Sequence, residues 1–179
     1  MTLLKEATSI KHKQAERMPF NTRMFNGLLS KNEYLLYLNQ QLQIFQTIER
    51  IGLPDNRLKR TENVQADIDE LKSQGYFSDL ILNKTIGYVN YLASLSFEQV
   101  LPHVYLNYMA IMFGGQMMKK VVPSSGRMYA FDNMKETIQS IRNVQKDEWA
   151  EEVNKGFEFI ILIFEELETV CNNRQLIST

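Results

Sequence analysis

Apolar residues recur every three or four positions along most of this chain, and this spacing is the feature that most constrains its fold. Such spacing places apolar side chains on one face of an α-helix, where neighbouring helices can bury them. Residues that interrupt helices are scarce, because only 8 glycines and 4 prolines occur among 179 residues. The chain is therefore predicted to be all-α, with residues 1–179 forming a single compact domain of several helices.

Glycines, prolines and a capping pattern divide the chain into predicted helices. Ser30 and Glu33 have the spacing of a capping box, which predicts a helix that begins there and continues toward Gly52. The other predicted helices cover approximately residues 2–18, 19–27, 56–73, 80–95, 96–122, 133–143 and 147–170. The segment PSSGRMYAFD (residues 123–132), between the predicted helices 96–122 and 133–143, is predicted to be a loop.

Composition and charge argue against several kinds of protein. The chain has 20 basic and 21 acidic residues, so it lacks the excess positive charge that binds nucleic acids or anionic membranes. A single cysteine, Cys171, rules out a disulfide within the chain and is compatible with a reducing compartment. The sequence contains neither the apolar stretch of a secretion signal nor an apolar run of about 18 residues. We therefore expect a cytoplasmic protein that binds neither nucleic acid nor membrane.

Gly114 and Gly115 are adjacent inside the predicted helix 96–122. Each glycine in a helix interior costs about 1 kcal/mol relative to alanine, so the pair requires a compensating role. The helical pattern continues as far as Val121, which argues against simple termination of the helix. Two roles remain: close packing of another helix, or contact between the bare backbone and a flat ligand, with a kink that opens and closes a pocket.

His12 has neighbours that suggest a binding site. Thr8, His12 and Glu16 are four residues apart and share one helix face, and Lys5 lies two turns before His12 on the same side. Glu16 could accept the proton of one ring nitrogen and leave the other free to bind a metal. Lys5 could meet an anionic group of the same ligand. A structural histidine is the competing interpretation, and the other histidine, His103, is interpreted as structural or solvated.

Four segments of the sequence resemble, in the same order, segments of the biliverdin-forming heme oxygenases. LKEATSIKHKQAE (Leu4–Glu16) resembles the segment around that family's proximal histidine. FGGQMMKK (Phe113–Lys120) resembles its distal-helix segment, and PSSG (Pro123–Gly126) and FEEL (Phe164–Leu167) recur at comparable places. Four ordered segments are more specific than any one of them.

The resemblance implies a heme-oxygenase-like all-α fold in which heme b lies between a proximal helix and a kinked distal helix. It implies that His12 binds the heme iron and that Glu16 forms a hydrogen bond with the His12 ring. It also implies that Gly114 and Gly115 let the distal backbone lie on the heme face. The other residues assigned to the heme site are Lys5, Thr8, Tyr105, Lys135, Arg142, Phe157 and Phe164. Core packing is the competing interpretation for the aromatic members of this set.

Two positions depart from the family's pattern. Gln139 stands where the family usually carries an arginine that reaches the heme propionates, and Arg142, three residues on, is the candidate substitute. Ile111 stands where the family carries the aspartate that holds the distal water network, and isoleucine cannot form hydrogen bonds. Asn107 lies one turn earlier on the same side and is the candidate for holding a water there, together with backbone carbonyls near the glycines.

The function implied by the resemblance is cleavage of heme at a meso carbon to biliverdin, iron and carbon monoxide. Heme is then both substrate and cofactor, and O2 is consumed. No G-x-G-x-x-G motif is present, so electrons are expected from an external ferredoxin or flavoprotein reductase. The protein is expected to be a monomer or weak dimer.

Two alternatives to this enzyme remain. Ile111 favours a non-catalytic or peroxidase-like heme-binding protein. A heme-free hydrolase resembling the thiaminases would need a nucleophile, and Cys171 lies near a predicted fraying helix end.

Overall fold

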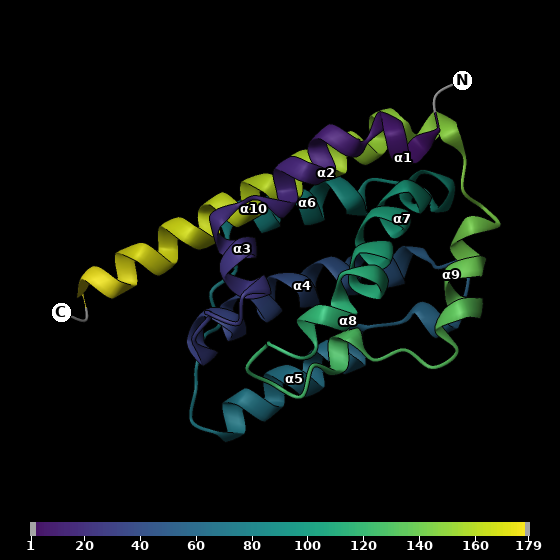
Figure 1. Cartoon of the computed structure of the whole chain (residues 1–179). Helices are drawn as coiled ribbons and strands as arrows, with labels where there is room; N and C mark the ends of the chain where they lie inside the picture. The colour runs from purple at the N-terminus through teal and green to yellow at the C-terminus, as the bar shows by residue number, and fades with distance from the viewer. Residues whose placement is uncertain (1–2, 178–179) are drawn as a thin grey trace.

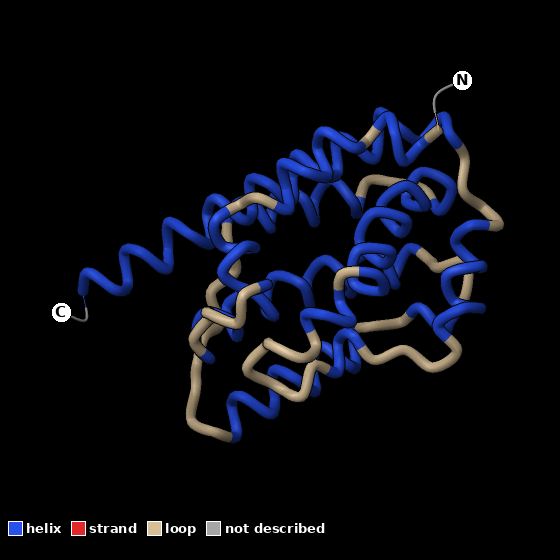
Figure 2. The backbone as a smooth tube through the Cα atoms, viewed as in Figure 1, coloured by secondary structure: helices blue, strands red, loops and turns tan. Residues whose placement is uncertain are grey.

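Helices are the regular elements of the computed structural model, which describes residues 3–177 and the side chains of residues 3–174 (Figures 1 and 2). The α-helices are α1 (Leu4–Ala7), α2 (Ser9–Glu16), α3 (Pro19–Phe25), α4 (Lys31–Ile51), α5 (Thr61–Ser73), α6 (Asn83–Ala93), α7 (Phe97–Phe113), α8 (Gly115–Met118), α9 (Met134–Arg142) and α10 (Ala150–Ile177). Three 3-10 turns are η1 (Asn56–Leu58), η2 (Arg127–Tyr129) and η3 (Asp147–Trp149). The all-α prediction is confirmed.

Two long helices organise the others. α10 runs beside α1 and α2 in Figure 1 and also contacts α3, α6 and α7. α4 contacts α5, α6 and α7 and forms the centre of the other half of the molecule. No helix within residues 3–177 has the length and apolar character needed to cross a membrane.

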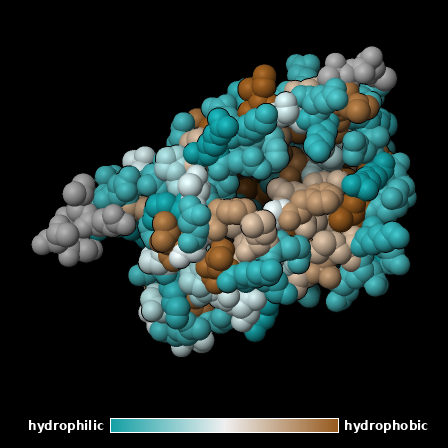
Figure 3. All heavy atoms as spheres, in the orientation of Figure 1, coloured by the Kyte–Doolittle hydropathy of each residue, from teal (hydrophilic) through white to brown (hydrophobic). Residues whose placement is uncertain are grey.

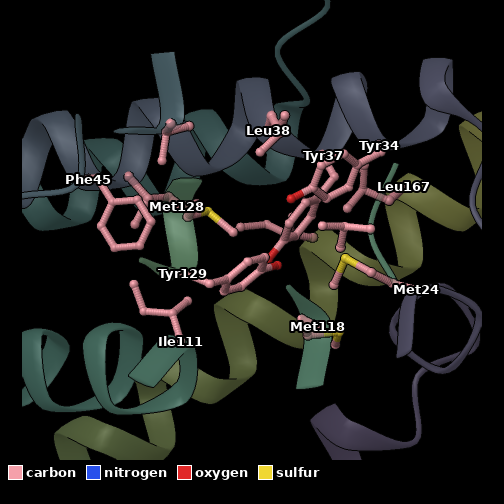
Figure 4. Close-up of a cluster of buried hydrophobic side chains, with 14 of the residues drawn as sticks. Met24, Tyr34, Tyr37, Leu38, Phe45, Ile111, Met118, Met128, Tyr129 and Leu167 are labelled. Atoms are coloured by element: carbon pink, nitrogen blue, oxygen red, sulfur yellow. The ribbon is translucent and has the colours of Figure 1, made fainter. Parts of the chain in front are cut away.

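Buried apolar side chains form two clusters. The larger cluster surrounds α4, and part of it is drawn in Figure 4. The smaller cluster joins α1, α2 and part of α7 to α10 and contains Leu4, Leu106 and Phe157. Met18, Tyr105 and Ile160 are partly buried and pack against both clusters. The helix that carries His12 is therefore held mainly by the smaller cluster.

The capping box at the start of α4 is present as predicted. The Ser30 hydroxyl accepts a hydrogen bond from the Glu33 N–H (3.2 Å), and the Glu33 carboxylate accepts one from the Ser30 N–H (2.8 Å). α4 ends at Ile51, and Gly52 follows with a φ of 143° that glycine adopts more readily than other residues.

Replacing Ser30 with alanine is expected to lower the free energy of unfolding by about 1 kcal/mol, because the Glu33 N–H at the start of α4 loses its acceptor. Urea denaturation measures the change. Ser73→Ala is the control, since the Ser73 hydroxyl is exposed at the end of α5, and its effect should stay within about 0.5 kcal/mol. Equal losses in the two variants would contradict the capping role.

The first helix is interrupted, so the prediction of one helix over residues 2–18 is wrong. Thr8 lies between α1 and α2 with φ −106° and ψ 0°, and its hydroxyl donates to the Leu4 carbonyl (2.9 Å). Back-bonding of this kind bends helices. At the start of α1, the Asp147 carboxylate accepts a hydrogen bond from the Leu4 N–H (2.8 Å). α2 ends at Glu16, two residues before the predicted end of the helix. Thr2 lies outside the described residues.

The predicted helix 56–73 is also divided. It begins as the turn η1, and α5 starts only at Thr61. The Glu49 carboxylate of α4 accepts a hydrogen bond from the Thr61 N–H (3.1 Å) and so caps α5. This cap comes from another helix, and a local pattern does not reveal it.

The predicted helix 80–95 is shorter than expected, because α6 begins at Asn83. The Gln40 side chain of α4 donates to the Leu80 carbonyl (2.9 Å) and accepts from the Leu82 N–H (2.9 Å). These bonds hold the residues before α6 outside the helix.

The last helix extends beyond its predicted end at residue 170. α10 continues to Ile177, and Cys171 is buried in the larger cluster. The prediction of a fraying helix end near Cys171 is therefore wrong. The predicted helix 147–170 begins as the 3-10 turn η3, and α10 starts only at Ala150. The predicted helix 133–143 closely matches α9.

Candidate functional site

The molecular surface is hollowed between α2 and the consecutive helices α7 and α8 (Figure 3). Apolar surface borders the hollow on the α7–α8 side. One face of these two helices, with residues three and four apart, stays exposed and carries Ala110, Phe113, Gly114 and Met117. Phe113 is 55% exposed and Met117 is 59% exposed. Large apolar side chains gathered on an exposed helix face are typical of a binding site.

Gly114 joins α7 to α8 and interrupts the regular hydrogen bonding of the long helix. Its backbone keeps right-handed helical angles (φ −68°, ψ −31°), and its N–H bonds to the Ala110 carbonyl (3.0 Å). The next bond runs from the Met117 N–H to the Gly114 carbonyl (3.1 Å), which is the closer spacing of a 3-10 turn. The interruption lies at the position where the sequence predicts a kink.

The two adjacent glycines have different surroundings. A Cβ on Gly115 would lie 2.5 Å from Cδ1 of Tyr129, a residue of η2 whose ring enters the larger cluster (Figure 4). Close packing therefore explains Gly115, although the partner is a tyrosine ring rather than a second helix. A Cβ on Gly114 would meet only the Ala110 carbonyl oxygen (3.2 Å). The exposed side of Gly114 is therefore open to a ligand.

This difference predicts opposite effects of two alanine substitutions. Gly115→Ala is expected to lower the free energy of unfolding by about 1–3 kcal/mol, because the Tyr129 ring must move. Gly114→Ala is expected to leave stability unchanged or raise it by up to about 1 kcal/mol, while weakening hemin binding. Urea denaturation and hemin titration of both variants measure these effects. Equal destabilisation by the two substitutions would contradict this assignment.

His12 and Glu16 form a pair on the exposed edge of α2. Nε2 of His12 lies 3.3 Å from a carboxylate oxygen of Glu16, and the His12 side chain is 55% exposed. The His12 ring also lies against Phe157 of α10, with 5.7 Å between ring centroids. One ring nitrogen thus has the predicted carboxylate partner, and the other is the candidate ligand nitrogen.

Thr8, Phe157 and Phe164, which were assigned to the site, are buried. Thr8 shares a helix side with His12, but its hydroxyl is already bonded to the Leu4 carbonyl. Phe164 stacks on Phe20 and Tyr37, with centroid distances of 6.2 and 6.5 Å, and belongs to the larger cluster. The structure gives Phe164 the role of a core residue.

The remaining assigned residues lie on or near the surface. Tyr105 of α7 is half-buried between the two clusters, and burial raises its pKa, while the positive charge of Arg142 opposes this rise. The C-terminal end of α9 therefore lies near Tyr105. Lys5 of α1 and Lys135 of α9 are exposed and are positioned by their helices alone.

Ile111 and Asn107 both point into the protein. Ile111 is 6% exposed and packs in the larger cluster, where Figure 4 shows it near Tyr129. The amide nitrogen of Asn107 donates to the Tyr88 hydroxyl (3.0 Å) and to the His103 carbonyl (2.9 Å). The amide group expected to hold a distal water is therefore engaged with α6, and only its oxygen remains available.

A buried network surrounds His103, which is 0% exposed, and the sequence-based predictions did not include it. Its Nδ1 lies 2.8 Å from the Tyr88 hydroxyl, and its Nε2 lies 2.9 Å from a carboxylate oxygen of Glu152. Burial lowers the pKa of His103, and Glu152 opposes this effect. The signal in the sequence was a pair of polar residues, His103 and Asn107, four apart in an apolar helix.

Residues of the helices that flank the hollow have the chemical properties that a heme site needs. An accessible imidazole with a carboxylate partner lies on α2, and bare backbone at Gly114 faces open space. Exposed Phe113 and Met117 offer apolar contact to a flat ring. The imidazole lies on α2, and the bare backbone and the apolar side chains lie on α7 and α8. The larger and smaller apolar clusters hold these helices in place.

Comparison with known proteins adds independent information. Residues 1–166 match the model of the family described as heme oxygenase. Heme oxygenase 2 of Macaca fascicularis is 24% identical over 93% of this chain, and the chain spans 64% of that protein's length.

Two solved structures share the fold. The crystal structure of heme oxygenase-1 from the cyanobacterium Synechocystis sp. PCC6803 in complex with heme has a TM-score of 0.79 and 20% identity, covering 98% of this chain and 95% of that one. The structure of heme oxygenase from Leptospira interrogans has a TM-score of 0.78 and 22% identity, covering 91% and 97%. The likeness extends over nearly all helices of this chain.

Proposed function

Because the chain belongs to the heme oxygenase family, we propose that it binds heme b between α2 and α7–α8 and cleaves it oxidatively. The products are biliverdin, iron and carbon monoxide, formed by opening the ring at a meso carbon with O2. The observation that carries this proposal is the pairing of an accessible His12–Glu16 couple on α2 with the open side of Gly114 on the helix across the hollow.

Each part of the proposed site has a physical task. His12 holds the iron, and Glu16 orients its ring through the 3.3 Å contact. The bare backbone at Gly114 leaves room on the distal side, where a side chain would block a small ligand. When bound, heme itself supplies the oxidative chemistry. The protein positions the macrocycle and limits the access of water to it.

The heme propionates and the edge of the macrocycle need further binding partners. Lys5, Lys135 and Arg142 are the cations proposed to meet the propionates, and their exposure on α1 and α9 suits groups at the rim of the hollow. Tyr105, with its ring half-buried beside Arg142, is proposed to contact the heme edge. Phe157 backs the His12 ring.

Electrons are proposed to come from a ferredoxin or a flavoprotein reductase that docks transiently, since the chain carries no G-x-G-x-x-G motif of its own. A cytoplasmic setting and a monomeric or weakly dimeric state are proposed with it, in keeping with the single cysteine.

A direct test is turnover of the hemin-loaded protein with ferredoxin, its reductase and NADPH under air. The Soret band should decay while a biliverdin band appears, and chromatography should identify the pigment. An intact Soret band under these conditions would contradict the proposed reaction. Hemin binding is measured separately by titration, so binding and turnover are distinguished.

A heme-binding protein without turnover, or with peroxidase-like behaviour, is the second candidate function. The observation that favours it is the burial of Ile111 in an apolar cluster, where no carboxylate is present to organise distal water. The turnover assay then yields a stable heme complex.

A heme-free hydrolase receives no comparable support. Burial raises the pKa of the Cys171 thiol to about 11, which keeps it protonated at neutral pH. A hemin titration that produces no Soret shift would favour the heme-free hydrolase instead.

A further inference from the structure

Five polar side chains from three helices form one hydrogen-bonded chain inside the protein. Asn107 of α7 donates to the Tyr88 hydroxyl of α6 (3.0 Å), and this hydroxyl lies 2.8 Å from Nδ1 of His103. Nε2 of His103 lies 2.9 Å from a carboxylate oxygen of Glu152 on α10. Tyr91 of α6 bonds to the same oxygen. We call these residues the His103 chain.

One arrangement of protons gives every donor of the His103 chain an acceptor. The amide nitrogen of Asn107 can only donate, so the Tyr88 oxygen accepts from it and the Tyr88 O–H is free to donate to Nδ1 of His103. His103 then carries its proton on Nε2 and donates it to Glu152. All donors point the same way, toward a carboxylate that is partly exposed.

The His103 chain fixes one part of α7 between two other helices. His103 and Asn107 lie one turn apart on α7, and Gly114 follows Asn107 after two further turns of the same helix. The α10 backbone approaches closely at this point, because a Cβ on Gly156 would lie 3.1 Å from Nδ1 of His103 and 2.5 Å from the Leu106 side chain. A shift of α7 along α10 would therefore break the chain.

We propose that His103 is a positioning residue that sets the placement of α7, and with it Gly114, relative to α10. This inference rests on the proposed function only in treating Gly114 as a heme contact. α2 and α7 are then tied to the same partner. α10 holds α2 through the smaller cluster, and it holds α7 through Leu101 and Leu106 of the same cluster and through the His103 chain.

Protonation of His103 is incompatible with this arrangement. A proton on Nδ1 turns that atom into a donor, so the Tyr88 O–H loses its acceptor inside the protein. The ionisable groups that face His103 are Tyr88 and Tyr91 from α6 and Glu152 and Lys155 from α10. Glu152 favours the charged ring, whereas burial and Lys155 oppose it.

The sign of the resulting pH dependence follows from the lowered pKa of His103. The stabilisation is complete above the ordinary histidine pKa of about 6.5 and is lost as the pH falls through the lower folded-state value. Glu152 acts in the same direction, because its pKa is also lowered in the folded protein. Acid should therefore loosen α7.

The test uses the heme-free protein and nitrogen-15 NMR, in which only two histidine rings appear. At pH 7.5, His103 is expected as the neutral tautomer with its proton on Nε2. Hydrogen exchange at the Gly114 and Gly115 amides is expected to be about tenfold faster in Tyr88→Phe, which keeps the ring stacked on Phe159 and removes both hydrogen bonds of the Tyr88 hydroxyl.

Tyr108→Phe is the matched control, because it removes a buried hydroxyl of α7 that bonds elsewhere, to Glu49 (3.3 Å). Its exchange at the two glycines should match the unmodified protein. Glu152→Gln retains an acceptor for Nε2 and should preserve the tautomer, whereas Glu152→Leu should not. A tautomer protonated on Nδ1, or equal exchange in Tyr88→Phe and Tyr108→Phe, would overturn the proposal.

Hemin titration of the same variants separates this inference from the proposed function. If the unmodified protein binds hemin, Tyr88→Phe should bind it several-fold more weakly than Tyr108→Phe does. If the unmodified protein binds no hemin, the proposed heme site fails, and the measurements on the heme-free protein still decide the role of His103.

Discussion

Alanine at position 12 is expected to weaken hemin binding by about 100-fold or more and to remove the absorption spectrum of imidazole-ligated heme. Loss of a group that only supports a metal ligand typically costs 10–100-fold in affinity, so loss of the ligand itself should cost at least as much. The fold should survive, because the His12 side chain is 55% exposed and substitutions at such positions change stability by about 0.5 kcal/mol or less. Absorbance titration with hemin measures the affinity.

Two companion variants make the His12 result specific. Glu16→Gln should weaken binding by about 10-fold to 100-fold, because the ligand ring loses its charged partner. Gln14→Ala, an exposed change on the same helix, should leave affinity unaltered. Added imidazole should restore the spectrum of His12→Ala. A variant lacking His12 that binds hemin with an unchanged spectrum would exclude this residue as the ligand.

Aspartate at position 111 is expected to lower the free energy of unfolding by about 4 kcal/mol at neutral pH. Ile111 is 6% exposed among apolar side chains, and an unpaired carboxylate is costly there. Burial would raise the pKa of the new carboxyl above its unfolded value, so the loss should be smaller at low pH and grow as the pH rises. Urea denaturation at pH 5.5 and pH 8 measures both effects.

Ile111→Val is the control for the loss of packing alone and should cost about 1 kcal/mol at both pH values. A loss in Ile111→Asp that is small and independent of pH would show that this side chain reaches water. Any gain in heme cleavage from a carboxylate at this position must be weighed against the cost to the fold.

Helix boundaries were predictable where the signals are local. The capping box of Ser30 and Glu33 and the stop at Gly52 depend on neighbours in sequence, and both are present. The late starts of α5 and α6 depend on distant partners, since Glu49 holds the Thr61 N–H and Gln40 holds the residues before α6. Single-sequence patterns do not contain those contacts.

The same distinction applies to the candidate site. His12 and Glu16 lie one turn apart, so their contact follows from helix geometry. The ring of Tyr129 against Gly115 comes from a loop that the sequence places beyond the helix. The partners of His103 are 15 and 49 residues away, which is why a buried network was interpreted as one isolated histidine.

The division of the interior into two clusters has a consequence for how a bulky molecule enters and leaves. Leu4 of α1 and Ala15 of α2 pack in the smaller cluster, so local opening of these two helices is expected to leave the helices around α4 folded. This opening exposes one wall of the hollow and gives a rigid macrocycle a route that the native side chains otherwise narrow. Admission of the substrate and escape of its opened product would then be governed by the local stability of the first fourteen described residues, 3–16, rather than by the stability of the whole molecule.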